Sequence, residues 1–218
     1  MMAAIVSNAA IAQTTDESFG AGTLYLTAGV GATFPPSGSL EDGGSVTING
    51  VLPLSALRLP SDLAPAVGIR FEALETSYGE ALYSGTDPRF VDEQIYSATR
   101  SHSVGLQTTR PGPGIFRPYA ALSIARVTFV LDAGDEKLER RAGAGAVLRA
   151  GSYVAFSRGS TPFVLDLSAA YHANGTRDQW RPGETVAVRD RADMFELSAR
   201  IGFASHPSPH PGIAKVNR

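Results

Sequence analysis

The chain has 218 residues, of which 18% are charged, with a net charge of −2 and no cysteine. Without cysteine there are no disulfides or thiolate metal sites, and the net charge argues against a nucleic-acid-binding surface. The sequence contains no run of 18 apolar residues, so it encodes no transmembrane helix. If the chain crosses a membrane, it must do so as a closed β-barrel.

The N-terminus resembles the end of a secretory signal peptide. Met2 to Ala12 is an apolar stretch that closes on the small-residue pattern Ala10-Ile11-Ala12, which is typical of a cleavage site. We therefore expect residues 1–12 to be a signal peptide, a mature chain that begins at Gln13, and an N-terminal extension over residues 13–21. No Lys or Arg precedes the apolar stretch, so we expect the start of this leader to be truncated.

Eight segments of about ten residues alternate apolar side chains with small or polar ones. In the segment from Phe163 to Ala173, for example, Leu165 and Leu167 flank Asp166. A strand turns successive side chains to opposite faces, so each segment has one apolar and one polar face. The expected strands are Gly22–Phe34, Val51–Leu59, Ala66–Tyr78, Ser97–Thr109, Arg117–Phe129, Gly143–Phe156, Pro162–Ala173 and Asp193–Phe203.

The connections between these strands alternate between long and short, as in bacterial outer-membrane barrels. The four long loops are Pro35–Gly50, Gly79–Ile95, Val130–Ala142 and Asn174–Arg191. The pattern predicts an all-β fold, an eight-stranded antiparallel up-and-down transmembrane β-barrel over residues 22–203. A soluble lipocalin-like barrel and a β-sandwich are the alternatives. The Pro- and His-rich residues 204–218 are expected to form a disordered periplasmic tail.

Three segments carry a resemblance to a known family: Leu24–Phe34, Arg117-Pro118-Tyr119-Ala120-Ala121-Leu122 and Phe195–Phe203. They resemble the OmpA-like bacterial outer-membrane β-barrels, in particular the surface-antigen branch of alphaproteobacteria. In that branch a Pro-Tyr opens a Gly/Ala-rich strand, and the last strand ends in an aromatic residue. The resemblance implies an outer-membrane location in a Gram-negative bacterium. Family barrels commonly end at the terminal Phe, whereas fifteen residues follow Phe203 here.

The polar faces of four strands carry charged residues that the barrel would enclose. An eight-stranded barrel is only wide enough for its interior side chains to fill it, and buried charges must be paired. We therefore predict an ion-pair network that closes the lumen, and a narrow gated ion path is the alternative. The members of the network are Arg70, Glu72, Arg149, Asp166, Glu196 and Arg200.

One short segment loosely resembles the catalytic region of outer-membrane lipid A deacylases. That region has a His, a Ser two residues later, and then an Asn. Here the stretch is His172-Ala173-Asn174-Gly175, and no serine follows the histidine. A serine hydrolase needs its nucleophile within hydrogen-bond reach of its base. We therefore expect no catalytic residues, and interpret His172 as a polar residue at the barrel rim.

Two further motifs have simple explanations. His206 and His210 lie in the Pro-rich tail without a third ligand, so we expect no metal and no cofactor. Lys137, Arg140 and Arg141 belong to a charged run that could contact lipopolysaccharide phosphates, although such runs are more often solvated loops.

Taken together, these features predict a small outer-membrane barrel with a structural or surface-interaction role. It would be a monomer with both termini in the periplasm and no open pore. Its expected partners are outer-membrane lipid and lipopolysaccharide, the outer-membrane assembly machinery, and a host or surface ligand bound by the long loops. A narrow gated pore and, less favoured, a lipid-modifying enzyme are the alternative functions.

Overall fold

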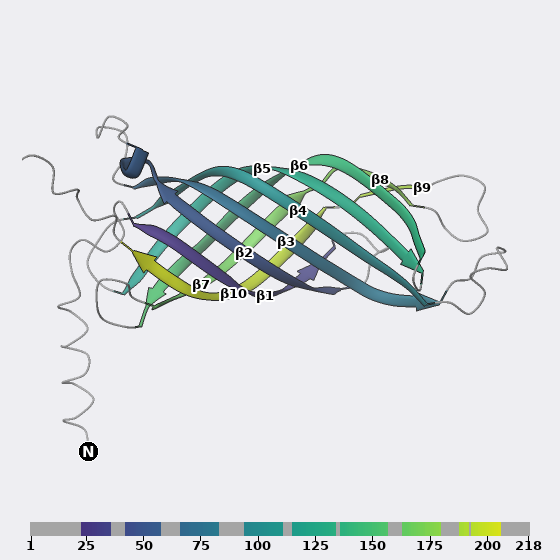
Figure 1. Ribbon diagram of the computed structural model, residues 1–218, viewed down its shortest axis with the longest axis horizontal. Coiled ribbons are helices and arrows are strands. Elements are labelled where there is room, and N and C mark those ends of the chain that lie inside the picture. The colour runs from purple at the N-terminus through teal and green to yellow at the C-terminus, as the bar shows by residue number, and fades with distance from the viewer. Residues whose placement is uncertain are drawn as a thin grey trace, which may run out of the picture.

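In the computed structural model of the chain, the described residues are 23–35, 42–57, 66–82, 94–110, 115–133, 136–156, 163–179, 188–191 and 193–205. Within them, eight strands close into one antiparallel barrel, and β8 pairs with β9 in a separate two-stranded sheet (Figure 1). The barrel strands are β1 (Leu24–Phe34), β2 (Gly43–Pro53), β3 (Val67–Leu82), β4 (Gln94–Thr109), β5 (Phe116–Ala133), β6 (Glu136–Ala155), β7 (Phe163–Ala173) and β10 (Met194–Ser205). The predicted fold class is confirmed.

The barrel wall has an apolar outer face and a largely polar inner face. On β5 the outward-facing Leu122 and Ile124 are 62% and 71% exposed, whereas Ser123 between them is buried inside. The same alternation holds along β1, β7 and β10. This is the reverse of a water-soluble barrel, whose outer face is polar, so it contradicts the lipocalin-like alternative. The closed ring of eight strands contradicts the β-sandwich.

The strands are strongly staggered around the barrel. From Phe34 on β1, successive cross-strand pairs lead through Phe195, Tyr171, Leu148, Leu122, Leu106, Ile69 and Leu52. The next step returns to β1 at Leu24, ten residues before the starting point, because the neighbouring pair is Val51 with Tyr25. Such a stagger tilts the strands by ~35–45° from the barrel axis. Every side chain on this line is apolar or aromatic.

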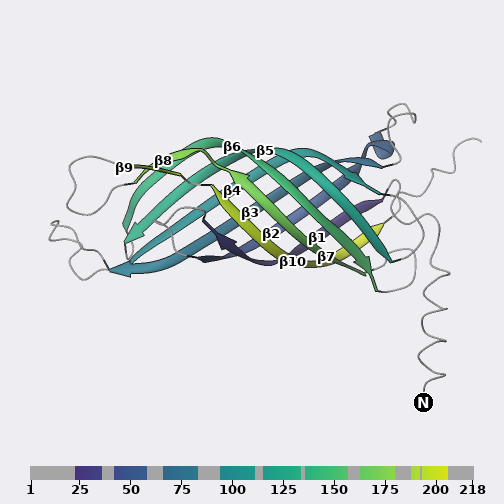
Figure 2. The same ribbon diagram turned by 180° about the vertical axis from the view of Figure 1, so that it is seen from behind.

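The two ends of the barrel differ. Leu24 lies opposite Ser205, so β1 begins and β10 ends at the same end, which we call the termini end. Phe34 lies opposite Phe195 at the other end, which we call the loop end. There the β8–β9 hairpin lies, and the paired strands β3–β4 and β5–β6 extend beyond β1 (Figures 1 and 2).

Aromatic side chains mark both edges of the outer wall. At the termini end, the Phe163 ring lies 4.6 Å from that of Phe203 and 6.2 Å from that of Phe156. At the loop end, the rings of Tyr171 and Phe195 are 5.0 Å apart. Aromatic girdles at two levels are typical of barrels that cross a bilayer, since these rings favour the interface with water.

The prediction for the second strand is wrong in its position. The strand covers Gly43–Pro53 rather than Val51–Leu59, and a 3-10 helix, Leu54–Leu57, follows it. The Gly- and Ser-rich start resembled a loop, but Ser45, Thr47 and Asn49 are the buried inner face of β2. Pro53 ends the strand because it has no N–H to donate to the ladder.

All four predicted long loops are partly strand, and in the first of them, Pro35–Gly50, β2 begins at Gly43. β5 and β6 run to Ala133 and from Glu136, so most of the expected loop Val130–Ala142 is paired sheet. Similarly, β3 extends to Leu82 and β4 begins at Gln94. The expected loop Asn174–Arg191 contains the hairpin of β8 (Thr176–Gln179) and β9 (Val188–Arg191). Hydrogen bonds between neighbouring strands can continue beyond the apolar band. There the outward residues need not be apolar, so the sequence no longer shows the alternation that indicates a strand.

At the chain ends, the structure reaches only part of what the sequence predicts. The expected signal peptide over residues 1–12 and the extension over 13–21 lie outside the described residues. Of the expected tail, Ala204 and Ser205 are the last residues of β10 rather than disordered, because they pair with Tyr25 and Leu24. Among described helices, none has the length and hydropathy needed to cross a membrane.

Candidate functional site: a charged layer across the barrel lumen

The structure places all six sequence-predicted charged residues inside the barrel. They project from β3, β6, β7 and β10, whose alternation turns them inward. Their exposed fractions run from 0% for Asp166 and Glu196 to 6% for Glu72. Three guanidinium groups face three carboxyl groups, so the formal charges balance. We call this set the charged layer: Arg70, Glu72, Arg149, Asp166, Glu196 and Arg200.

Arg149 is the centre of the charged layer. Its Nη2 lies 2.8 Å from Glu72 Oε1 and 2.7 Å from Glu196 Oε2. Its Nη1 donates to the hydroxyls of Ser168 and Ser198, at 2.9 and 3.3 Å. One side chain from β6 therefore binds two carboxylates from strands elsewhere on the wall. Charge-assisted hydrogen bonds of this length are among the strongest in proteins.

Arg200 supplies the second cation. Its Nη1 lies 2.8 Å from Asp166 Oδ2, on the neighbouring strand β7. Its Nη2 donates to Ser198 Oγ at 2.8 Å and is 3.7 Å from Glu72 Oε2. The Tyr119 hydroxyl donates to the other Asp166 oxygen at 2.6 Å. Both oxygens of this buried carboxylate are thus hydrogen-bonded, as burial of a charge requires.

Arg70 binds a carboxylate of its own strand. Its Nη2 lies 2.8 Å from Glu72 Oε2, two residues along β3, and its Nη1 donates to Gln107 Oε1 at 2.7 Å. Its guanidinium also lies over the Tyr119 ring, 5.5 Å from the ring centre. Glu72 therefore accepts from both Arg70 and Arg149, which links the two parts of the layer.

His172 also belongs to this network, which sequence analysis missed. It is fully buried rather than exposed at the rim, and its Nε2 lies 3.0 Å from Glu196 Oε2. Ser45 donates to the other Glu196 oxygen at 3.5 Å. The alternation along β7 already placed His172 on the inner face, on the same side as Asp166, so the sequence alone could have assigned it to the barrel interior. The imidazole is engaged with a carboxylate inside the barrel wall rather than with a serine.

Beside the charged layer, towards the termini end, three tyrosines form a stacked cluster that we call the tyrosine layer. The rings of Tyr25 and Tyr153 are 3.9 Å apart and nearly parallel, and Tyr119 stacks on Tyr153 at 4.7 Å. These rings come from β1, β5 and β6, so they meet across the lumen. Tyr119 and Tyr153 lie in two of the strands expected from the sequence, Arg117–Phe129 and Gly143–Phe156, but their contact could not be predicted, since register decides which rings meet.

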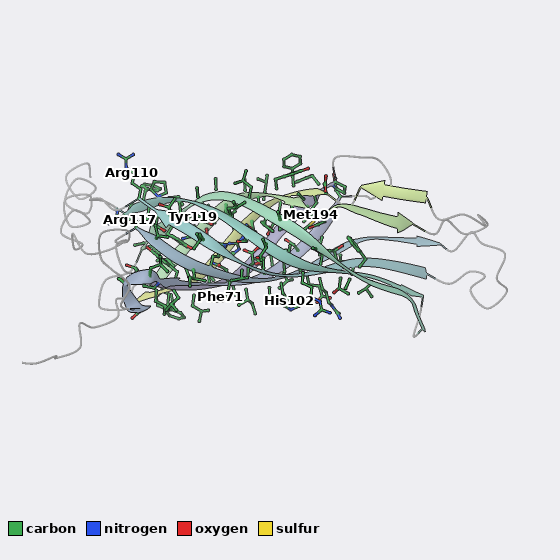
Figure 3. The ribbon with its side chains drawn as sticks, turned by 90° about the horizontal axis from the view of Figure 1, so that it is seen from above. Phe71, His102, Arg110, Arg117, Tyr119 and Met194 are labelled. Atoms are coloured by element: carbon green, nitrogen blue, oxygen red, sulfur yellow. The ribbon has the colours of Figure 1, made fainter. Side chains whose placement is uncertain are left out.

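Towards the loop end, small apolar side chains fill the lumen. Ala125, Val127, Val147 and Ala170 form one buried cluster, against which Phe129 packs. A second contact joins Leu74 with Met194, which is labelled inside the barrel in Figure 3. We call these residues the apolar layer. The charged layer therefore lies between an aromatic and an aliphatic layer, both of which reduce access of water to its charges.

Two other candidates from the sequence, the histidines of the tail and the charged run of Lys137, Arg140 and Arg141, cannot be assessed as sites. Among the described residues, no group of three or more His, Cys, Asp or Glu is arranged to hold a metal ion. His206 and His210 lie outside the described residues, and the structure describes no side chains for Lys137, Arg140 and Arg141, although their backbone belongs to β6.

Comparison with solved structures finds barrels of similar topology at low sequence identity. Neisserial surface protein A shares 17% identity over 84% of this chain and 96% of its own, with a TM-score of 0.47. Ail of Yersinia pestis, solved with the heparin analogue sucrose octasulfate, shares 12% over 84% and 99%, with a TM-score of 0.51. The N-terminal β-barrel domain of Pseudomonas aeruginosa OprF shares 13% over 85% and 98%, with a TM-score of 0.47. No protein-family model and no curated protein sequence matches the chain. These likenesses concern the fold.

Proposed function

We propose that this protein is an outer-membrane β-barrel of a Gram-negative bacterium, with a closed lumen and a structural or surface-interaction role. The observation that carries the proposal is the continuous outward line of apolar side chains, from Phe34 through Leu122 to Leu24. Water-exposed apolar surface on this scale is unfavourable in solution. A hydrocarbon surround turns the same surface into the expected lipid contact. The OmpA-like resemblance supports this location, and its alphaproteobacterial branch stays a prediction.

The inner face supports a closed lumen rather than a pore. Contacts cross the interior at two levels: Arg149 of β6 reaches Glu72 of β3, and Tyr153 of β6 stacks on Tyr25 of β1. An ion would have to displace these contacts to pass. We therefore favour the structural or surface-interaction role over the narrow gated pore. We also favour it over a lipid-modifying enzyme, because His172 is bound to Glu196 inside the wall.

The ends of the barrel suggest an orientation. We propose that the termini end, with Leu24 and Ser205, faces the periplasm, and that the loop end faces outward. The β5–β6 pair and the β8–β9 hairpin would then project beyond the membrane as a rigid platform for a host or surface ligand. A monomer inserted by the outer-membrane assembly machinery is consistent with a barrel whose eight strands close on themselves.

Two measurements test the proposal together: the cellular location of the protein and the resistance of its closed barrel to detergent. The chain, expressed in a Gram-negative host, should fractionate with the outer membrane and run faster on gels unheated than boiled, because the closed barrel resists detergent. Planar bilayers holding the purified protein should show no steady current at neutral pH. A soluble, non-heat-modifiable protein would refute the membrane role, and a stable current would favour the pore.

A further inference from the structure

The inner face of the β1–β2 ladder is a line of hydroxyl side chains that lie opposite glycines. The successive pairs from the loop end inward are Thr33 with Gly43, Ser45 with Gly31, and Thr47 with Gly29. At the next pair, Asn49 donates from Nδ2 to Thr27 Oγ1 at 3.2 Å. The apolar layer takes no residue from β1 or β2. The described residues of these two strands therefore form a polar side of the lumen between the loop end and the charged layer.

Two neighbouring side chains of this line each have a buried polar atom that is not hydrogen-bonded. Among the described residues, neither Thr47 Oγ1 nor Asn49 Oδ1 has a partner, and the two residues are 1% and 0% exposed. A buried polar atom without a hydrogen bond costs free energy, because it has lost its contact with water. In native proteins such atoms are usually bonded to ordered internal water.

A third such atom lies across Gly29 from Thr47. Gly29 of β1 pairs with Arg200 of β10 on one side and with Thr47 of β2 on the other. Arg200 binds Asp166 and Ser198 through Nη1 and Nη2, whereas its buried Nε has no partner within the described part of the chain. Glycine has no side chain, so β1 places none between Arg200 and Thr47. Their Cα atoms are about 10 Å apart, two ladder spacings, and a water molecule can bridge their side chains.

The chemistry of the three atoms identifies a ligand that both donates and accepts hydrogen bonds. The Nε–H of Arg200 can only donate, Asn49 Oδ1 can only accept, and the Thr47 hydroxyl can do either. An anion would be repelled by Asn49 Oδ1 and by the carboxylate of Glu72, which lies directly opposite Asn49. A metal cation would be repelled by the guanidinium of Arg200. Water suits all three atoms, and an internal water typically makes about three hydrogen bonds.

We propose that Thr47, Asn49 and Arg200 form a binding site for internal water, which the line of Thr33 and Ser45 connects to the loop end. The wall formed by β1 and β2 is then the hydrated side of the lumen, and the wall formed by β5, β6 and β7 is the dry side. The contact between Arg149 and Glu72 still crosses the interior, so hydration of one side is compatible with a lumen closed to ions. The inference concerns the inner face of the barrel and does not depend on the proposed cellular location.

The first test measures the transfer of polarisation from water protons to side chains by solid-state NMR, with the full wild-type chain folded in lipid bilayers. Thr47 and Asn49 should receive it several-fold faster than Val127 and Val147 of the apolar layer, which are similarly buried. Equal rates at Thr47 and Val127 would overturn the proposal. So would a shift of the Arg200 Nε–H signal when chloride is replaced by iodide, because it would indicate a bound anion.

The second test removes the hydroxyl while keeping nearly the same side-chain shape. In Thr47→Val the bound water loses a partner, so the urea midpoint of unfolding should fall and polarisation transfer to Asn49 should weaken. At a dry site the same change removes an unpaired buried hydroxyl, so a midpoint at or above that of wild type would contradict bound water. The control Thr108→Val should not lower the midpoint, because Thr108 is exposed on the outer face of β4. If Thr47→Val does not fold, the wild-type NMR measurement decides.

Discussion

Arg149 and Glu72 make a contact that crosses the barrel, with 2.8 Å between Nη2 and Oε1. Their strands, β6 and β3, are separated in the ring by β5 and β4. The same Nη2 also lies 2.7 Å from Glu196 Oε2 on β10. One guanidinium therefore joins three parts of the wall that share no ladder with one another, and the predictions below begin from this residue.

Replacement of Arg149 should strongly destabilise the barrel. Arg149→Ala leaves Glu72 and Glu196 buried without their shared cation, and breaking a buried pair costs ~3–5 kcal/mol. Urea titration, read as loss of the fast-migrating gel band, measures the change. The matched control is Arg100→Ala, because its pair with Glu75 is exposed and should contribute only ~0–1 kcal/mol. Equal midpoints for the two variants would contradict a central role for Arg149.

Opening the lumen should require changes in more than one layer. Tyr153→Ala removes the ring between Tyr25 and Tyr119, and Arg149→Ala removes the central cation. We expect wild type and each folded single variant to be silent in planar bilayers, and the double variant to show a small current. If Tyr153→Ala alone conducts as well as the double variant, the charged layer does not close the lumen.

A charge in the middle of the apolar band should be costly. Leu122 is 62% exposed on the outer face, and an arginine at the bilayer midplane costs ~2–4 kcal/mol. Ser77→Arg is the control, since Ser77 lies outward on β3 beyond Glu75, near the interface, where the cost falls to ~0–1 kcal/mol. Folding into lipid vesicles as a function of urea gives both values. Equal tolerance of the two arginines would mean that the outer wall does not face hydrocarbon.

Gly151 is needed for the tyrosine layer. It lies directly opposite Tyr119, and a Cβ at this position would be 2.8 Å from Tyr119 Cζ and 2.6 Å from the Leu167 carbonyl oxygen. The second contact is with backbone, which cannot move without disturbing the ladder. Gly151→Val should therefore cost ~1–3 kcal/mol through overpacking. The outward neighbour variant Ala150→Val is the control, and a Gly151→Val barrel as stable as this control would contradict the close fit.

The sequence was sufficient for the fold and for the membership of the charged layer. Leu165, Asp166 and Leu167 show why: a period of two, with a charge on one face and leucine on the other, determines which side chain is enclosed. The sequence could not predict the pairs within the charged layer, because partners such as Arg149 and Glu72 depend on the stagger of the strands and on side-chain rotamers. The position of β2 was missed because Ser45, Thr47 and Asn49 resemble loop residues unless the opposite face is known.

The order of contacts along the chain has a consequence for assembly. Arg70 and Glu72 can pair on a single strand, and Asp166 and Arg200 within one pair of neighbouring strands. Arg149, in contrast, gains its two carboxylates only when β3, β6 and β10 surround one lumen. A barrel that is still open between β1 and β10 therefore keeps this cation incompletely paired in a low-dielectric surround. Pairing of β1 with β10 and full pairing of the interior charges therefore occur together, as one cooperative event. This disfavours sheets that have entered the membrane but have not closed.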